Sequence, residues 1–555
     1  MKIVIVGGVA AGMSAATRLR RLQEDAEIIV FDKGPYVSFA NCGLPYHISG
    51  EIAERSSLIV QSPKSLKQRF NIDVRPLHEV ISIQAENKTI TVRNAEETFT
   101  ESFDKLILAP GAIPFIPPLK GFTEADNIFT LRNILDLDNI MEAIKNKQLE
   151  NAVIIGAGFI GLEMVENLSR IGLNITLLEK APQVLPALDK EMAAFVEREL
   201  RANNIKVITN QAAQALEDAG KTIVLEDGTR LKSDLTILSV GIKPNTEFIK
   251  SSGIELGLRD GIIVDNQYRT NFPDIYAVGD AIIVKNQVSQ KDDLIALASP
   301  ANRQGRQVAD IISGVNSCNK GSIGTAILRI FNLTTASTGL NERMAKKLAL
   351  DYQVIHGTYN NHAGYFPGKS PIILKLVFDR SNGKIYGAQA IGKEGVDKRI
   401  DVLSTAIKAG LNVYDLQELE LAYAPPFSSA KDPVNMLGYA AANLLDGFSE
   451  SIQWYELEDE LSKGKVLLDF REISELERNG KFKAAINIPL SSLRDNLDKL
   501  DKNQAYVLTC HSTVRSYFAE RLLKQLGFDV VNLDGSFSIY SAIKPEDIEK
   551  FDAKP

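Results

Sequence analysis

Two glycine-rich turns, about 150 residues apart, constrain the fold of this chain more than any other feature. The first, Gly7–Gly12, follows an apolar strand pattern and opens a helix pattern that runs through Leu22. The second, Gly156–Gly161, follows a strand pattern that begins at Ala152. Glycine allows the tight strand-to-helix turn, and the helix N-terminus behind it faces the pyrophosphate of a dinucleotide. The pattern predicts two Rossmann-like α/β units, although one such turn alone also fits other doubly wound folds.

Each turn is followed, about 20 positions further on, by an acidic residue that ends the next strand. Such an acid accepts hydrogen bonds from the ribose hydroxyls, and Glu179 favours NADH because it repels a 2′-phosphate. The neighbouring Lys180 leaves NADPH open as well. The first turn carries Val9 where the fingerprint has its middle glycine. The residues predicted to contact the dinucleotides are Gly7, Gly8, Val9, Ala10, Ala11, Asp32 and Lys33 in the first unit, and Gly156, Gly158, Phe159, Ile160, Gly161 and Glu179 in the second.

Composition limits the classes of protein to which the chain can belong. Its 555 residues are enough for three or four domains, and 45% hydrophobic and 24% charged residues are typical of a soluble globular protein. A net charge of −7 argues against a nucleic-acid partner. The apolar runs are strand-sized, no signal peptide precedes the first strand, and three scattered cysteines cannot form a disulfide framework. We therefore expect a cytoplasmic protein with reduced thiols, no membrane partner and no metal site.

Cys42 is a single thiol just beyond the first glycine turn, and the next nine positions hold no second cysteine. An isolated cysteine is most often a small buried hydrophobe. If Cys42 takes part in redox chemistry, its partner sulfur has to come from outside the protein, through thiolate attack and a mixed disulfide.

Four further segments carry a resemblance to a known family: residues 104–112, 234–245, 270–281 and 297–305. Together with the two turns and Cys42, they make the chain resemble the flavoprotein pyridine nucleotide–disulfide oxidoreductases over about residues 1 to 320. The resemblance implies FAD on the first unit, NADH or NADPH on the second, and a flavin beside Cys42. Its further implied cofactor contacts are Val80, Ala109, Gly111, Arg132, Gly241, Gly279, Asp280, Ala298 and Pro300.

The surroundings of Cys42 separate the classes within that family. His47 stands five positions on, where dithiol reductases have their second cysteine, and this excludes that class. Peroxide- and oxygen-reducing members carry a histidine in the first glycine loop, whereas this loop reads Gly8-Val9-Ala10-Ala11. The segment 38–46 instead resembles that of coenzyme A disulfide reductases. Bound flavin and nearby helix amides are expected to lower the pKa of the Cys42 thiol.

Coenzyme A carries a 3′-phosphate and a pyrophosphate, so its pocket should offer cations. Arg18 and Arg21 lie three positions apart on the first helix and share a face, which could equally be an ordinary solvated face. The resemblance places five residues near this substrate: Ser14, Arg18, Arg21, Ser38 and Asn41.

Residues 325–447 resemble the dimerisation domain of the same flavoproteins, with strands predicted at 372–378 and 385–391. The resemblance implies a homodimer in which Tyr365 and Tyr423 reach the active-site sulfur of the partner subunit. A phenol there could donate a proton to a departing thiolate.

A new α/β pattern follows, with strands predicted at 465–470 and 505–509, a strand and turn at 484–489, and a segment at 530–535 that closes the pattern. Cys510 opens a strand–loop–helix segment that ends at Arg515, an arrangement whose amides converge on the sulfur as an anion-binding nest. Cysteine phosphatases have five residues between these two, and the four present here resemble the rhodanese loop that carries a sulfane sulfur. Thr513 and Ser536 stand where rhodaneses often have glycine.

The whole chain thus resembles coenzyme A disulfide reductase–rhodanese fusions, which are also known for NADH-dependent persulfide reductase activity. We predict FAD, NAD(P)H and coenzyme A as ligands, Cys42, Cys510, Tyr365, Tyr423 and Arg515 as catalytic residues, and coenzyme A disulfide, coenzyme A persulfide or polysulfide as substrate. An oxidase or peroxidase using a Cys42 sulfenic acid, and a sulfurtransferase with a redox-gated flavin module, remain open. The predicted domains are 1–118 with 246–324 for FAD, 119–245 for NAD(P)H, 325–447 for dimerisation and 455–550 for the rhodanese-like part.

Overall fold

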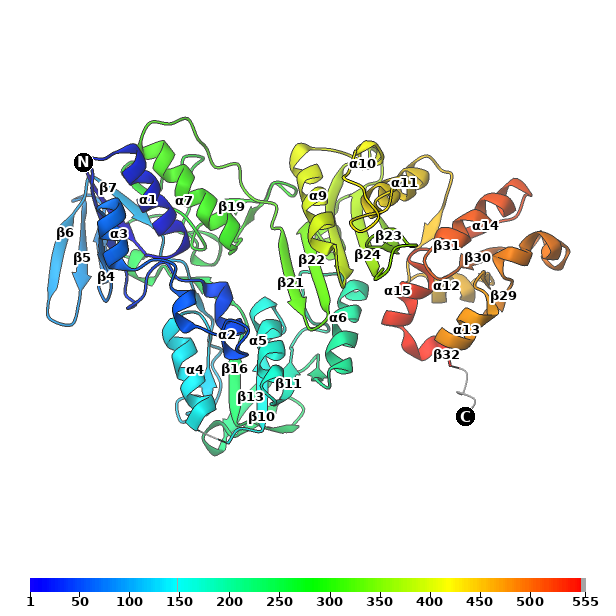
Figure 1. Ribbon diagram of the computed structural model, residues 1–555, viewed down its shortest axis with the longest axis horizontal. Coiled ribbons are helices and arrows are strands. Elements are labelled where there is room, and N and C mark those ends of the chain that lie inside the picture. The colour runs from blue at the N-terminus through cyan, green and yellow to red at the C-terminus, as the bar shows by residue number, and fades with distance from the viewer. Residues whose placement is uncertain (147, 551–555) are drawn as a thin grey trace. The chain divides into compact units, whose positions relative to one another are not determined.

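The computed structural model describes residues 1–146 and 148–550, which form two compact units (Figure 1). The first unit comprises residues 1–182 and 204–324. The second comprises residues 183–203 and the chain from residue 325 on. Helix α6 (Lys190–Ala202) therefore belongs to the second unit, although it lies within the range predicted for NAD(P)H.

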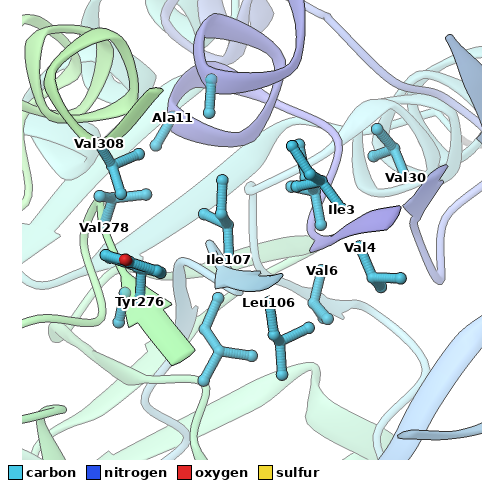
Figure 2. Close-up of a cluster of buried hydrophobic side chains, with 14 of the residues drawn as sticks. Ile3, Val4, Val6, Ala11, Val30, Leu106, Ile107, Tyr276, Val278 and Val308 are labelled. Carbon is cyan, nitrogen blue, oxygen red and sulfur yellow. The ribbon is translucent and has the colours of Figure 1, made fainter. Parts of the chain in front are cut away.

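The first sheet of unit 1 is parallel, in the order β18-β7-β1-β2-β3. Its strands are apolar along their length because helices and loops cover both faces. Figure 2 shows the side chains of β1, β7 and β18 packed together, with Ala11 and Val308 from the two helices α1 and α7. The elements are β1 (Lys2–Val6), β2 (Glu27–Phe31), β3 (Asp73–Arg75), β7 (Lys105–Leu108), β18 (Ile275–Ala277), α1 (Ala10–Leu22), α2 (Leu44–Ile48), α3 (Pro63–Phe70) and α7 (Ala298–Ile312), with the antiparallel β4 (Glu79–Gln84), β5 (Thr89–Arg93) and β6 (Thr98–Ser102) beside them.

The second sheet of unit 1 repeats this arrangement, in the order β12-β11-β10-β16-β9 and again parallel. In both sheets the strand order reverses beside the first strand, which is where doubly wound folds bind nucleotides. Its elements are β9 (Ile128–Phe129), β10 (Asn151–Ile155), β11 (Asn174–Leu178), β12 (Lys206–Ile208), β16 (Leu235–Leu238), α4 (Ile134–Asn146) and α5 (Phe159–Arg170), with β13 (Ala213–Glu217), β14 (Thr222–Leu225) and β15 (Arg230–Lys232) as a small sheet and β8 (Ala112–Pro114) paired with β17 (Ile242–Pro244).

Unit 2 begins with an antiparallel sheet in the order β21-β22-β25-β24-β23. The strands predicted at 372–378 and 385–391 are confirmed as β24 and β25. Helices α9 and α11 bury their apolar faces on this sheet. The elements are β21 (Ala326–Ile330), β22 (Leu333–Gly339), β23 (Tyr352–Asn360), β24 (Pro371–Asp379), β25 (Ile385–Gly392), α8 (Glu342–Lys347), α9 (Val396–Ala409), α10 (Val413–Glu418) and α11 (Pro433–Leu445).

The C-terminal part of unit 2 is a parallel sheet in the order β26-β31-β30-β27-β29. The strands predicted at 465–470, 484–489 and 505–509 are confirmed, with ends shifted by a residue or two, and the closing segment 530–535 contains β31. None of the helices in the described part of the chain is long and apolar enough to span a bilayer. The elements are β26 (Ser451–Ile452), β27 (Val466–Asp469), β29 (Ala485–Asn487), β30 (Tyr506–Thr509), β31 (Val530–Leu533), α12 (Leu457–Ser462), α13 (Ile473–Asn479), α14 (Val514–Gln525) and α15 (Ser536–Ile543), with the pair β28 (Lys481–Phe482) and β32 (Ile548–Glu549) at the side.

Candidate active sites

Unit 1 contains a cavity of about 1080 Å³ at the carboxyl ends of β1, β2 and β7. It gathers residues that are up to about 290 positions apart in the chain, from the first glycine turn to the start of α7. Two predicted contacts lie behind its wall: Gly8 donates its N–H to Asp32, and Pro300 is buried in the first turn of α7. The predicted FAD contacts that line the cavity are Gly7, Val9, Ala10, Ala11, Asp32, Lys33, Val80, Ala109, Gly111, Arg132, Gly279, Asp280 and Ala298.

The turn after β1 is shaped to receive an anion. Gly7 has φ +102°, and a Cβ there would lie 2.1 Å from the carbonyl oxygen of Ala109, so no other residue fits. Within the described chain, no side chain caps the N-terminus of α1, which leaves its first amides open toward the cavity. Uncapped amides and the helix dipole suit a pyrophosphate, so the site fits the predicted dinucleotide.

Three half-buried charged side chains face this cavity. Asp32 accepts N–H bonds from Gly8 (2.7 Å) and Gly34 (2.8 Å), and burial raises its pKa. Burial likewise lowers the pKa of Arg132 and raises that of Asp280, although the two attract each other. For each group, the hydrogen bonds and charges of the protein offset only part of the cost of desolvation. This is expected of a cavity that binds a polar ligand.

Cys42 lies in a 3₁₀ turn (Asn41–Gly43) before α2, is exposed, and lines the same cavity. Partial burial raises the pKa of its thiol, and the carboxylates of Glu163 and Asp280 add to the shift. Our sequence-based expectation of a lowered pKa concerns the site with flavin bound beside the thiol, and it stays a prediction. Burial and the two carboxylates thus favour the thiol form of Cys42 over the thiolate.

The predicted coenzyme A contacts separate into two groups. Ser14, Arg21, Ser38 and Asn41 line the cavity with Cys42. Arg18 instead directs its Nε to Asp310 Oδ1 on α7, at 2.6 Å, as an ion pair. Although Arg18 and Arg21 are close on α1, only the second belongs to the cavity wall among the described residues.

The second glycine turn has the same construction as the first. Gly156 has φ +105°, and a Cβ there would lie 2.4 Å from Ser239 O, while the space around Gly158 is open. Glu179 accepts N–H bonds from Ala157 and Ala181, both at 2.7 Å, which fixes the carboxylate beside the turn. Phe159, Ile160 and Gly161 form the first turn of α5, and Gly241 takes φ +126° after β16.

Tyr365 and Tyr423, 58 positions apart, meet in unit 2 with a hydroxyl–hydroxyl distance of 2.9 Å. They are 76% and 48% exposed, and the hydrogen bond raises the pKa of Tyr365. The loops that carry them, residues 361–368 and 421–428, are held by the buried Arg399, which donates to Asn361 O (2.8 Å) and Ser428 Oγ (3.2 Å). Sequence reasoning missed Arg399, since a lone arginine in a helix pattern carries no signal of its own.

Residues 510–515, here called the Cys510 loop, join β30 to α14. Cys510 is buried, its N–H donates to Ser536 Oγ (3.4 Å), and its carbonyl accepts from Phe537 N–H (3.0 Å). Thr513 and Ser536 have φ of +78° and +50°, so both take a left-handed backbone conformation that glycine adopts readily.

Polar atoms without partners surround this loop in the described chain. They are His511 Nδ1, Thr513 Oγ1 and Nη1 of the buried Arg471, whose guanidinium stacks 3.7 Å from the centre of the Phe537 ring. Burial lowers the pKa of His511, and Arg471 and Arg515 act in the same direction. Buried donors of this kind fit an anionic sulfur ligand.

Arg515 makes a two-pronged ion pair with Glu475 on α13 (2.5 and 2.7 Å), which raises the pKa of the arginine. Sequence reasoning did not assign a role to Glu475 or Arg471. Arg471 is bound by Asp469 (2.6 Å) at the end of β27, and the spacing Asp-x-Arg after a strand was the available signal.

Three family models match this chain. The pyridine nucleotide-disulphide oxidoreductase model covers residues 1–305, its dimerisation-domain model covers residues 325–433, and the rhodanese-like domain model covers residues 453–542.

Individual relatives match over long stretches. A coenzyme A disulfide reductase of Staphylococcus haemolyticus is 39% identical over 446 residues, which is 80% of this chain and 100% of that protein. The structure of reduced Bacillus anthracis CoADR-RHD has a TM-score of 0.97 and 48% identity over 99% of each chain. A NAD-dependent persulfide reductase from A. fulgidus has a TM-score of 0.92 and 37% identity, over 97% of this chain and 100% of that one.

Proposed function

Since this chain belongs to the pyridine nucleotide-disulphide oxidoreductase family, we propose that it is a FAD-dependent NAD(P)H:coenzyme A disulfide or persulfide reductase with a fused sulfurtransferase domain. The observation that carries the proposal is the position of Cys42. A single cysteine lines the cavity that also holds the nucleotide-binding turn and the coenzyme A candidates Ser14, Arg21, Ser38 and Asn41. The relatives named coenzyme A disulfide reductase and persulfide reductase support the substrate class.

The reductive half uses Cys42 as the nucleophile. Its thiolate attacks a sulfur of the substrate, so that the substrate S–S bond breaks, a Cys42 mixed disulfide forms, and one thiolate or hydrosulfide leaves. FAD held by the Gly7 turn, Asp32 and Asp280, and reduced by NAD(P)H, would supply the two electrons that return Cys42 to the thiolate and release coenzyme A. Arg21, one of the cations of the cavity wall, would meet a coenzyme A phosphate in this proposal.

The tyrosine pair supplies protons to this step in our proposal. A homodimer, supported by the dimerisation-domain match, would bring Tyr365 and Tyr423 to Cys42 of the partner subunit. Because the two hydroxyls share a hydrogen bond, one can donate to the departing thiolate while the other stabilises the phenolate that remains.

The sulfur-transfer half uses Cys510. Its thiolate attacks the outer sulfur of a persulfide, so that the donor S–S bond breaks, Cys510 carries the sulfane sulfur, and the donor leaves as a thiolate. The unpartnered donors around the loop and Arg515 support an anion at this position. Glu179 supports NADH as the preferred nucleotide, and we propose a cytoplasmic enzyme. We also propose the domain ranges predicted from the sequence, except that residues 183–203 with α6 belong to the second compact unit.

Flavin reoxidation tests the proposal. The purified protein is reduced with NADH and then mixed with coenzyme A disulfide, coenzyme A persulfide, polysulfide or peroxide. We expect rapid reoxidation by the coenzyme A sulfur species, loss of turnover in Cys42→Ser, and normal turnover in Cys318→Ser, whose cysteine lies outside both sites. Cys510→Ala should lose sulfur transfer and keep disulfide reduction.

Rapid reoxidation by peroxide alone would instead support a Cys42 sulfenic acid oxidase, and full turnover in Cys42→Ser would overturn the mechanism.

A further inference from the structure

A buried histidine in unit 2 joins three parts of the chain. His356 on β23 directs Nδ1 to Asp534 Oδ2 (2.7 Å) and Nε2 to Glu191 Oε1 on α6 (3.1 Å), and the three side chains are at most 3% exposed. In addition, the His356 N–H donates to Asp534 Oδ1 (3.0 Å). A single residue of the antiparallel sheet thus holds both oxygens of a carboxylate in the rhodanese-like part.

Asp534 lies directly before the segment that supports the nucleophile. Gly535 and Ser536 follow it with φ of +66° and +50°, and Ser536 Oγ with Phe537 N–H makes the two hydrogen bonds to Cys510. A second contact from the same strand reaches this segment, because Thr358 Oγ1 donates to Ser538 Oγ at 3.4 Å. Helix α15, which begins at Ser536, also packs on α6 (Figure 1).

Glu191, which contacts His356 Nε2, is itself fixed by further buried contacts. Glu191 accepts from Lys375 Nζ (2.5 Å) and from Trp454 Nε1 (3.2 Å). Although Asp189, Glu191 and Glu342 converge like metal ligands, the Lys375 ammonium lies between them at 2.5–2.8 Å and takes the place of a cation. The cluster therefore fixes Glu191, and Glu191 in turn fixes the Nε2 side of His356.

We propose that His356 is a positioning residue for sulfur transfer: it fixes Asp534, and through it the 535–537 turn that holds the backbone of Cys510. This inference rests on the proposed sulfurtransferase role of Cys510. A left-handed Ser536 is unfavourable by itself, so its position has to be imposed by its neighbours, and the Asp534 carboxylate is fixed two residues before it. Without that anchor, Ser536 and Phe537 lose their register with Cys510.

A pair of substitutions separates the two contacts of the ring. In His356→Asn the amide nitrogen can occupy the position of Nδ1 and still donate to Asp534. In His356→Gln the amide nitrogen reaches the position of Nε2 and donates to Glu191 instead. Sulfur transfer is measured as thiocyanate formed from coenzyme A persulfide and cyanide, above the rate of Cys510→Ala.

We expect His356→Gln to lower kcat for sulfur transfer roughly 10- to 100-fold, as misplacement of a nucleophile does, and His356→Asn to retain most of the activity. NADH-dependent reduction of coenzyme A disulfide should be unchanged in both. In a Cys42→Ser, Cys318→Ser background, the rate of Cys510 alkylation by iodoacetamide should change in His356→Gln and remain near the parent value in His356→Asn.

Equal sulfur transfer and alkylation in His356→Gln and the parent protein would overturn the inference, as would an equal loss in both variants. Fluorescence of Trp454, the one tryptophan of the chain, reports whether the junction is intact. If His356→Gln does not fold, Asp534→Asn replaces it, and full sulfur transfer in that variant refutes the role. If the parent protein transfers no sulfur, the proposed function fails, whereas the alkylation rates still decide whether His356 positions Cys510.

Discussion

Two residues around Cys510 take a backbone conformation that glycine adopts more easily. Thr513 has φ +78° and also buries a hydroxyl that has no hydrogen-bond partner among the described residues, while Ser536 has φ +50°. A left-handed residue with a Cβ costs about 1–2 kcal/mol, and a β-branched one is the least suited to it. Strain of this size is retained where a site requires a particular backbone conformation. Here the two residues define the backbone around the buried Cys510 thiol.

Thr513→Gly should therefore stabilise the protein. Removing the strain and the unpartnered hydroxyl outweighs the flexibility that glycine adds to the unfolded chain, for a net gain of about 1 kcal/mol in the free energy of unfolding. Urea unfolding followed by Trp454 fluorescence measures the change. Ser512→Gly is the matched control, since Ser512 does not have a positive φ, and it should destabilise. A loss of stability in Thr513→Gly would contradict this account.

The thiol of Cys42 offers a second prediction at this scale. Glu163 raises the pKa of this thiol, after burial, so Glu163→Gln should lower the pKa by a few tenths of a unit, as expected for one partly screened charge. The pH dependence of Cys42 alkylation by iodoacetamide, followed by mass spectrometry, gives the midpoint. Glu54→Gln, which changes an exposed carboxylate outside the cavity, should leave the midpoint unchanged. A shift of equal size in both variants would mean that Glu163 has no specific effect.

At the scale of elements, loops with no regular structure are positioned by single side chains of neighbouring helices. Arg399 on α9 is 1% exposed and ties both tyrosine-bearing loops to Asp432, which also caps α11. Its planar fork suits several acceptors at once, a geometry that lysine cannot reproduce. The Tyr365–Tyr423 hydrogen bond is thus a consequence of a buried ion pair beneath the loops.

Arg399→Met should cost about 3–5 kcal/mol, because it leaves the buried Asp432 carboxylate without its guanidinium. Lys398→Met is the control: Lys398 is 3.7 Å from Asp432 but its side chain is 31% exposed, so we expect less than about 1 kcal/mol. Chemical denaturation of both variants gives the comparison. Similar losses in the two would indicate that the buried pair is not what holds the loops.

The elements themselves were largely predictable. Strands β24 and β25 lie within one residue of the bounds 372–378 and 385–391 that the sequence predicted, because the apolar run and the turn residues that end it are neighbours in the chain. The roles of Arg18 and Arg399 were not predictable in this way. Each depends on a partner at least 33 positions away, Asp310 and Asp432, and only the packing of α1 on α7 and of α9 beside α11 brings them together.

At the scale of the whole molecule, a charged network is buried where α6, the antiparallel sheet and the rhodanese-like part meet within unit 2. Burial alone would lower the pKa of His356, but Asp534 and Glu191 outweigh it and raise the pKa to about 9, with Lys375 opposing them. Lys375 and His356 in turn hold the pKa of Glu191 well below its ordinary value. Stability of this junction therefore depends on pH.

The sign follows from the raised pKa of His356. Its protonation contributes stability that is complete below the ordinary value of 6.5 and is lost as the pH rises through about 9. We expect the free energy of unfolding to decrease by at most about 3 kcal/mol as the pH rises from 6.5 to 9. The midpoint of urea unfolding, followed by Trp454 fluorescence, should fall accordingly. His356→Asn removes the titrating group and should flatten this part of the curve. An identical pH dependence in the two proteins would show that His356 does not contribute to it.

By itself, the sequence determined the strand–turn–helix units, the single thiol after the first turn and the Cys-x4-Arg loop. Glycine turns and apolar periodicity act between neighbouring residues, so local chemistry is enough to specify them. Tertiary structure alone decided that Arg21 lines the cavity while Arg18 pairs with Asp310, that the Cys42 pKa is raised, and that His356 meets Asp534 across 178 positions. Desolvation and long-range ion pairs depend on which surfaces pack together, and no local pattern in the chain encodes that.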